Sequence, residues 1–228
     1  MERVLSVSWS STSLRRKLRS RTVRRALSDS FRVAARYCRS EIKIKRSRFI
    51  ATIQHVGSVD EAKDFVQAVS KEFHDATHNC YAYRIGLGSD QVFKYSDDGE
   101  PSGTAGRPIL EALDRFELVD TCIVVTRYFG GTKLGTGGLS RAYRDAALDV
   151  ISKAGFETRY QKDRVRLAFH LRFTNTVLRT LSSEVCDIID SEYTNAGAIT
   201  CDIRRSSVEK IKQSLISATN GRIEIEDV

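Results

Sequence analysis

Hydrophobic and polar residues follow two different periods along the chain beyond residue 40. The stretch "SRFIATIQHV", residues 47–56, alternates and is rich in Ile, Phe and Val, which predicts a strand. Residues 58–73 follow the helical period instead. Their first residue, Ser58, is a candidate N-cap, and Glu61 stands three positions later, which is the spacing of a capping box. The sequence therefore begins a folded body with a strand followed by a helix.

The remainder of the first half predicts further strands and helices around two glycine-rich segments. Strands are expected at "NCYAYRIG" (79–86) and "QVFKYS" (91–96), across a turn at "LGSD". A polar loop, "DDGEPSGTAGRP", then leads into a short helix at 108–116. The segment "DTCIVVTRYF" (120–129) is apolar on consecutive residues, which predicts a strand buried inside a sheet. A last helix is expected from Leu139 to Gly155, where the glycine ends it.

The second half has a different order of elements. Strands are predicted at 163–171, 186–193, 198–205 and 222–228, and helices at 174–184 and 207–220. This β-α-β-β-α-β order is that of the ferredoxin-like split unit. We therefore predict a disordered basic tail at 1–38, a first domain at 39–157, a linker near 156–162 and a second domain at 160–228.

Charge is distributed unevenly. The 228-residue chain has a formal net charge of +8, but residues 1–40 hold 11 Arg or Lys against only Glu2 and Asp29. The rest of the chain is nearly neutral, so the basicity belongs to the tail. Three interpretations of the tail stay open: an organelle transit peptide, a disordered arm that binds RNA phosphates, or an upstream extension without a structural role. It lacks the apolar segment of a secretory signal.

The cysteines and the hydropathy argue against a disulfide-linked, zinc-binding or membrane-spanning protein. The five cysteines are scattered and form no CxxC pair, which is typical of free thiols in a reducing compartment. No metal site is assigned to the cysteines and histidines, because a zinc site needs clustered ligands and the four histidines supply none. No window approaches the roughly 18 consecutive apolar residues of a membrane span.

The two glycine-rich loops carry the candidate chemistry. Each precedes a predicted helix, whose first N–H groups lack partners and attract anions such as phosphate. Each loop also brings cations, Arg107 in the first and Arg127 with Lys133 in the second. Neither loop fits the P-loop or Rossmann pattern. The predicted ligand-binding residues are Ser102, Gly103, Thr104, Gly106, Arg107, Arg127, Tyr128, Gly130, Gly131, Lys133, Gly135, Thr136, Gly137 and Gly138. The alternative is that the glycines only permit tight turns and close packing.

Acids and aromatics accompany these loops. Asp97, Asp98 and Glu100 could hold Mg²⁺ beside a phosphate or act as general acid and base, unless they form a solvated acidic turn. Tyr128 and Phe129 could stack on a base, unless they pack in the core. We expect both loops to converge on one cleft, with Asp98, Glu100 and Thr104 opposite Arg127 and Lys133.

The motifs "YSDDGEPSGTAGRPIL" and "IVVTRYFGGTKLGTGGLSRAY" resemble the IMPACT family, and its bacterial YigZ-like branch in particular. The resemblance covers about Glu41 to Val228. It implies an α+β protein. Its N-terminal domain would have the fold of the second domain of a small-subunit ribosomal protein. Its C-terminal domain would be ferredoxin-like and similar to one in elongation factor G.

The resemblance implies a role in translation without a settled reaction. Our first hypothesis is a cytoplasmic regulator that binds RNA, the ribosome or a nucleotide through the two loops. The alternatives are an enzyme acting on a phosphorylated small molecule or nucleotide, and a non-catalytic scaffold. If the tail is a transit peptide, the location would be an organelle.

Overall fold

The computed structural model describes residues 29–182 and 185–228, and these divide into two compact units. The larger unit is Phe31–Arg159, and the smaller contains Tyr160–Val228. Residues 1–28, which hold most of the predicted basic tail, lie outside the described residues.

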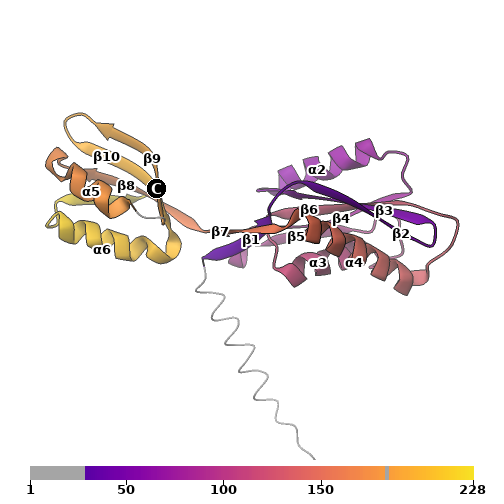
Figure 1. Cartoon of the computed structure of the whole chain (residues 1–228). Helices are drawn as coiled ribbons and strands as arrows, with labels where there is room; N and C mark the ends of the chain where they lie inside the picture. Colours follow the sequence, from indigo (N-terminus) through magenta and orange to yellow (C-terminus); the bar gives the residue numbers. More distant parts are fainter. Residues whose placement is uncertain (1–28, 183–184) are drawn as a thin grey trace, which may run out of the picture. The chain divides into compact units, whose positions relative to one another are not determined.

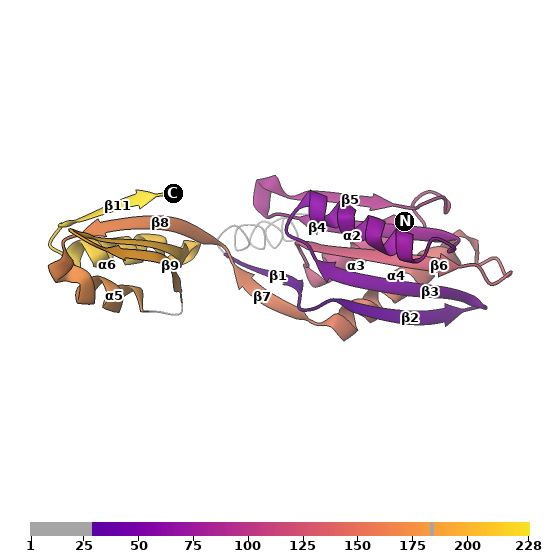
Figure 2. The ribbon, with the colours of Figure 1, turned by 90° about the horizontal axis from the view of Figure 1, so that it is seen from above.

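The larger unit is built on a five-stranded antiparallel sheet with helices on both faces (Figure 1). The strands, in spatial order, are β2 (Cys38–Ile44), β3 (Ser47–His55), β6 (Thr121–Tyr128), β4 (His78–Ile85) and β5 (Val92–Ser96). Helix α2 (Val59–Glu72) covers one face, and α3 (Gly106–Phe116) and α4 (Gly135–Ala154) cover the other, as Figure 2 also shows. A short 3₁₀ helix, η1 (Gly88–Asp90), lies between β4 and β5.

Strand β6 is the middle strand of this sheet, and its apolar run follows from that position. Ile123 and Val125 pack in the core beneath α3 and α4, while Cys122 and Val124 pack in the core beneath α2. Because helices cover both faces, consecutive residues of an antiparallel strand can all be apolar. The prediction of a buried strand here is confirmed.

Helix α2 begins as its sequence predicts. The Ser58 side chain accepts a hydrogen bond from the backbone N–H of Glu61 at 3.1 Å. The Glu61 carboxylate reaches one residue beyond the usual capping-box partner and accepts from the N–H of Gly57 at 2.8 Å. Ala62, Phe65 and Val69 then form its buried stripe.

Three boundaries differ from the sequence-based expectation. The tail was expected to extend to residue 38, but β1 (Ser30–Ala34) is a strand with Val33 and Ala34 buried. The expected linker contains β7 (Phe156–Tyr160), which pairs with β1. Helix α4 begins at Gly135, four residues before the predicted start. The first two differences share one cause, because β1 and β7 pair across a sequence separation that local patterns cannot show.

The smaller unit has the predicted order of elements. It contains β8 (Lys162–Phe169), α5 (Thr174–Leu181), β9 (Cys186–Tyr193), β10 (Gly197–Arg204), α6 (Val208–Ala218) and β11 (Ile223–Asp227), with short 3₁₀ helices η2 (Leu171–Phe173) and η3 (Arg205–Ser207). The antiparallel sheet has the order β11-β8-β10-β9. The last two residues of the predicted helix 174–184 lie outside the described residues.

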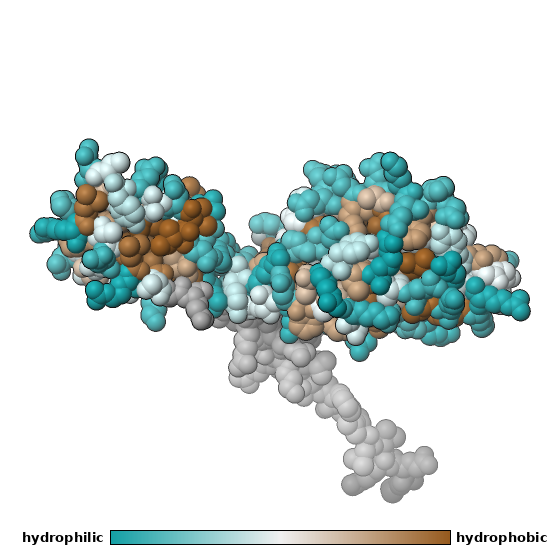
Figure 3. Space-filling view, turned by 45° about the horizontal axis from the view of Figure 1, so that its top comes forward, coloured by the Kyte–Doolittle hydropathy of each residue, from teal (hydrophilic) through white to brown (hydrophobic). Residues whose placement is uncertain are grey.

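One face of this small sheet is covered and the other is open. Val165, Leu167, Ile199 and Ile203 share a buried cluster with residues of α5 and α6, such as Leu215. Figure 3 shows that this unit also carries a region of apolar surface. Its exposed large apolar side chains include Ile188 and Ile189 of β9, the strand at one edge of the sheet.

Candidate functional site

The first loop provides its own anion for the start of α3. The carboxylate of Asp97 accepts hydrogen bonds from the backbone N–H groups of Ala105 and Gly106, both at 2.9 Å, and of Gly103 at 2.8 Å. These N–H groups are the ones that a bound phosphate would need. The start of α3 is therefore an anion site already occupied by a side chain of the same chain.

The backbone structure explains why two positions of this loop are glycines. Gly103 has a φ of +74°, which favours glycine. A Cβ on Gly106 would lie 2.7 Å from the carbonyl oxygen of Ser96, so the two backbone segments approach too closely for a side chain. Together with the Asp97 cap, these glycines are explained by the fold of the loop itself.

Of the other site residues predicted in the first loop, some bond within the protein and others lie on the surface. The Asp98 carboxylate accepts from the N–H of Asn79 at 2.6 Å, and the buried Thr104 hydroxyl donates to the Pro101 carbonyl at 2.6 Å. Ser102 is exposed. The Arg107 side chain is 68% exposed and pairs with Glu111 on the same helix at 3.3 Å.

Glu100 brings the first loop into contact with the end of β6. Its Oε1 accepts from Nη1 of Arg127 at 2.5 Å and from the hydroxyl of Tyr143 at 2.8 Å. The Glu100 and Arg127 side chains are only 3% and 6% exposed, so this is a buried ion pair. The Arg127 guanidinium also lies over the rings of Phe49 and Phe129, at 5.5 and 5.4 Å.

The cluster extends from Glu100 toward β4. Nε2 of His78 lies 3.9 Å from Glu100, and the Cys80 thiol contacts the Tyr143 hydroxyl at 3.4 Å. Burial raises the pKa of both the Cys80 thiol and the Tyr143 hydroxyl. Neither is therefore prepared as a nucleophile at neutral pH. The cluster holds the loop to the sheet, and it places the charge of Arg127 inside the unit.

The two loops meet, but not around an open cleft for a ligand. Glu100 and Arg127 meet, but as partners of each other. The three acids predicted as catalytic candidates are all engaged, Asp97 with a helix start, Asp98 with a backbone N–H and Glu100 with Arg127. Tyr128 lies on the opposite face of β6 from Arg127, where its hydroxyl donates to Asp75 at 2.7 Å.

The glycines of the second loop differ in what they do. A Cβ on Gly130 would lie 2.1 Å from the carbonyl carbon of Arg46, so this glycine permits a close backbone approach. Gly131 and Gly135 have φ values of +81° and +71°. Gly137 has no positive φ, and nothing lies within 4 Å of a Cβ built there. Neither turn geometry nor packing explains Gly137.

The first turn of α4 is open where that of α3 is closed. Leu134 stands at its N-cap position without a side-chain cap, and the first turn contains no acidic residue. Gly135, Thr136 and Gly137 are exposed, and Gly138 is half-buried. A 20-residue helix thus presents its positive end and its unpartnered N–H groups to solvent.

Cations and an aromatic ring lie in the segments that adjoin this turn. Lys133 lies two residues before Gly135, the first residue of α4, and is exposed. The hairpin turn between β2 and β3 contributes exposed Lys45 and Arg46, and its backbone touches Gly130. Phe129 is 46% exposed. Lys45 and Arg46 were missed in the sequence, although two adjacent cations between two alternating segments were the available signal.

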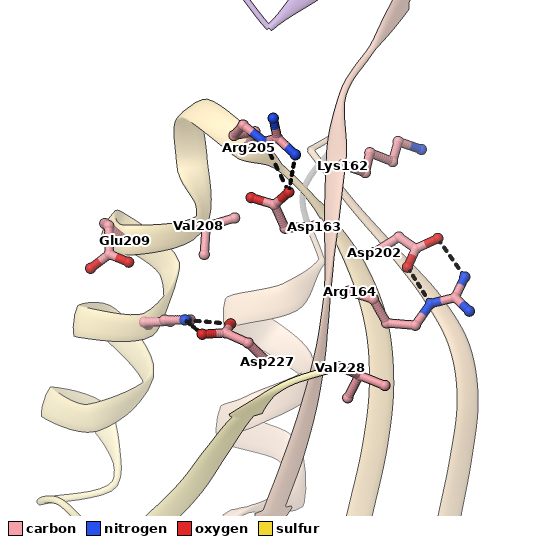
Figure 4. A pocket seen from close by; sticks show the side chains of 10 residues that line it. Lys162, Asp163, Arg164, Asp202, Arg205, Val208, Glu209, Asp227 and Val228 are labelled. Carbon is pink, nitrogen blue, oxygen red and sulfur yellow. Dashed lines mark hydrogen bonds and ion pairs between the residues drawn. The ribbon is translucent and has the colours of Figure 1, made fainter. Parts of the chain in front are cut away.

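The smaller unit has a hollow of its own, lined mainly by charged side chains (Figure 4). Six of its charged side chains form three ion pairs with one another. Arg205 bonds Asp163 at 2.8 Å, Arg164 bonds Asp202 at 2.7 Å, and Lys212 bonds Asp227 at 2.6 Å. Because acidic side chains already neutralise these cations, we expect the hollow to bind an anion more weakly than the first turn of α4 does.

Two further findings concern the described residues as a whole. Within 29–182 and 185–228, no three His, Cys, Asp or Glu side chains are grouped so that they could hold a metal ion. In the same ranges, no helix is both long enough and apolar enough to cross a membrane.

Comparison with known proteins identifies the family. The Impact N-terminal domain matches residues 45–151. The IMPACT family member YvyE of Bacillus subtilis (strain 168) is 37% identical over 191 residues, which cover 82% of this chain and 86% of that protein. The chain belongs to the IMPACT family. The resemblance carried by the two glycine-rich motifs is confirmed.

Another IMPACT relative and a solved structure are also similar to this chain. The family member YigZ of Escherichia coli (strain K12) is 48% identical over 102 residues, covering 44% of this chain and 50% of that protein. A crystal structure of a hypothetical protein superposes with a TM-score of 0.65 at 30% identity, covering 88% of this chain and 98% of the other. The similarity to that structure thus extends over most of the chain.

Proposed function

We propose that this IMPACT family member is a cytoplasmic translation-related regulator whose larger unit binds RNA phosphates at the first turn of α4. The single observation that carries the proposal is the contrast between the two helix starts. Asp97 fills the first with a carboxylate, whereas the second has no cap and no acid in its first turn. The family resemblance supplies the link to translation.

The surroundings of α4 favour RNA over a small anion. Lys45, Arg46 and Lys133 are separate exposed cations, so they can neutralise successive phosphates of a strand. The exposed ring of Phe129 offers a face on which a base can stack, with the Arg127 guanidinium 5.4 Å from its centroid. The proposed binding residues are therefore Lys45, Arg46, Phe129, Lys133 and the glycine-rich turn 135–138.

The smaller unit, which we propose is the ferredoxin-like domain of the family, is less suited to RNA. By strand register, its open sheet face carries more acids than bases. The acids are Asp187, Asp190, Glu192, Asp202, Glu224 and Glu226, and the bases are Lys162, Arg164, Arg166 and Arg204. We assign the RNA contacts to the larger unit for this reason.

Co-sedimentation with ribosomes and binding to single-stranded RNA, each at several salt concentrations, test the proposal. With three cations on phosphates, we expect the logarithm of the binding constant to fall with the logarithm of salt concentration with a slope of about −2. Lys133→Ala should weaken binding and reduce that slope by about 0.7.

Arg107→Ala is the matched control, because Arg107 is an exposed cation in the first turn of the helix that Asp97 already caps. It should leave RNA affinity within about twofold. No association with ribosomes or RNA at low salt would refute the proposal and favour a scaffold. A loss of binding in Arg107→Ala but not in Lys133→Ala would place the site elsewhere.

A further inference from the structure

Two of the five cysteines lie on neighbouring strands of the smaller unit. Cys186 is the first residue of β9, opposite Ile203 of β10, and Cys201 of β10 is opposite Ile188. Both cysteines therefore point to the helix-covered face and occupy a diagonal pair. Cys201 belongs to the buried cluster there, and Cys186 packs against the same cluster.

The two thiols are neighbours on this face of the sheet, and their environments differ. A hydrogen bond between them lowers the pKa of Cys186, which is half-buried. The same bond, together with burial, raises the pKa of Cys201. Lys162 of β8 favours the Cys186 thiolate, whereas Asp187 of β9 itself and Asp202 of β10 oppose it. The accessible thiol is thus the better nucleophile, and its partner is kept protonated inside the core.

We propose that Cys186 and Cys201 form a peroxide-sensitive dithiol that closes to a disulfide. The Cys186 thiolate attacks one oxygen of hydrogen peroxide, the O–O bond breaks, and the departing hydroxide takes a proton to become water. Cys186 is then a sulfenic acid. The Cys201 sulfur attacks the Cys186 sulfur, and the expelled hydroxide leaves with the Cys201 proton as a second water. Two thiols lose two electrons, and one peroxide is reduced to two waters.

The bond would join the beginning of an edge strand to its only partner strand in the described sheet. It would close the hairpin formed by β9 and β10 as a covalent loop. Because a cross-link restricts the unfolded chain, the smaller unit should become more stable on oxidation. Its melting temperature should rise by at least about 5 °C, reversibly with a dithiol reductant.

The test treats the full chain with hydrogen peroxide and maps its peptides without reducing agent. We expect a cross-link between Cys186 and Cys201 and the rise in melting temperature. Cys38 is the internal control, because it is also half-buried but lies on β2 in the larger unit. It should remain alkylatable under conditions that cross-link the pair.

Two variants make the order of events testable. In Cys201→Ala, Cys186 should stop at the sulfenic acid and be trapped by dimedone. In Cys186→Ser, which changes the more accessible position, Cys201 should remain a thiol. The proposal is overturned if peroxide leaves Cys201 alkylatable while Cys186 proceeds to the sulfinic acid, or if Cys38 reacts as fast as Cys186.

Discussion

Gly130 and Gly137 lie in the same glycine-rich segment but should respond oppositely to the same substitution. A methyl group on Gly130 would lie 2.1 Å from the Arg46 carbonyl carbon and 2.3 Å from its oxygen. Both atoms belong to a backbone held in the β2–β3 hairpin, so they cannot move aside as a side chain would. At Gly137 the same methyl group meets nothing within 4 Å, and its backbone is already helical.

The two effects can be estimated separately. Gly130→Ala inserts a methyl group into a close-packed contact, which should cost about 1–3 kcal/mol in the free energy of unfolding. Gly137→Ala removes a glycine from a helix, which should stabilise the larger unit by about 0.5–1 kcal/mol. The two variants should therefore differ by about 2 kcal/mol or more. At about 4 °C per kcal/mol, the melting temperatures should differ by roughly 8 °C.

The difference in unfolding free energy can be measured from hydrogen exchange of the α4 amides in denaturant. These amides report on the larger unit alone, so unfolding of the smaller unit does not contribute. We expect slower exchange in Gly137→Ala than in the wild type, and faster exchange in Gly130→Ala. Destabilisation of Gly137→Ala by more than about 1 kcal/mol would show that this glycine has a structural role. It could then no longer be attributed to ligand approach.

Three further predictions follow from the ion pairs and the chain boundary. Glu100→Ala, which leaves Arg127 buried without its partner, should cost about 3–5 kcal/mol in urea unfolding, whereas exposed Glu111→Ala should cost less than about 1 kcal/mol; equal costs would contradict the buried-pair description. The hydrogen bond from Arg164 lowers the pKa of Asp202 below its ordinary value of 3.8, so this stabilisation exists above that value and is lost as the pH falls through the folded-state pKa. Arg164→Gln should reduce the drop in melting temperature between pH 6 and pH 3, while Arg166→Gln on the same strand should not, and the reverse ranking would refute the assignment. A chain beginning at residue 29 should have the melting temperature of the full chain, whereas one beginning at residue 39 lacks β1 and should melt at a lower temperature. Equal melting temperatures of the two shortened chains would mean that β1 contributes nothing to stability.

Local patterns were sufficient for most of the fold. The alternation at residues 47–55 and the helical period after Ser58 predicted β3 and α2, and the cap of α2 is the one its sequence indicates. The apolar run at 122–126 predicted a strand at the centre of the sheet, because only a strand covered on both faces tolerates such a run.

The remainder depended on contacts between distant parts of the chain. The early start of α4 could not be predicted, because Gly135, Gly137 and Gly138 have low helix propensity and read as a loop. The role of Asp97 was equally hidden, since its carboxylate caps a helix that begins nine residues later, through a folded loop. The sequence thus predicted two equivalent anion sites, and only the fold distinguishes the helix start that Asp97 caps from the one without a cap.

The central claim is that an anion binds at the first turn of α4 and not at that of α3. The most direct measurement is the change in backbone amide chemical shifts, by ¹H–¹⁵N NMR, as inorganic phosphate and then a short single-stranded RNA are added to the full chain. The N–H signals of Gly135, Gly137 and Gly138 should move with saturation, and the RNA should saturate at a lower concentration than phosphate. The signals of Gly103 and Gly106, whose N–H groups donate to Asp97, should stay in place. Saturating shifts at Gly103 and Gly106, with none at the α4 glycines, would contradict the claim.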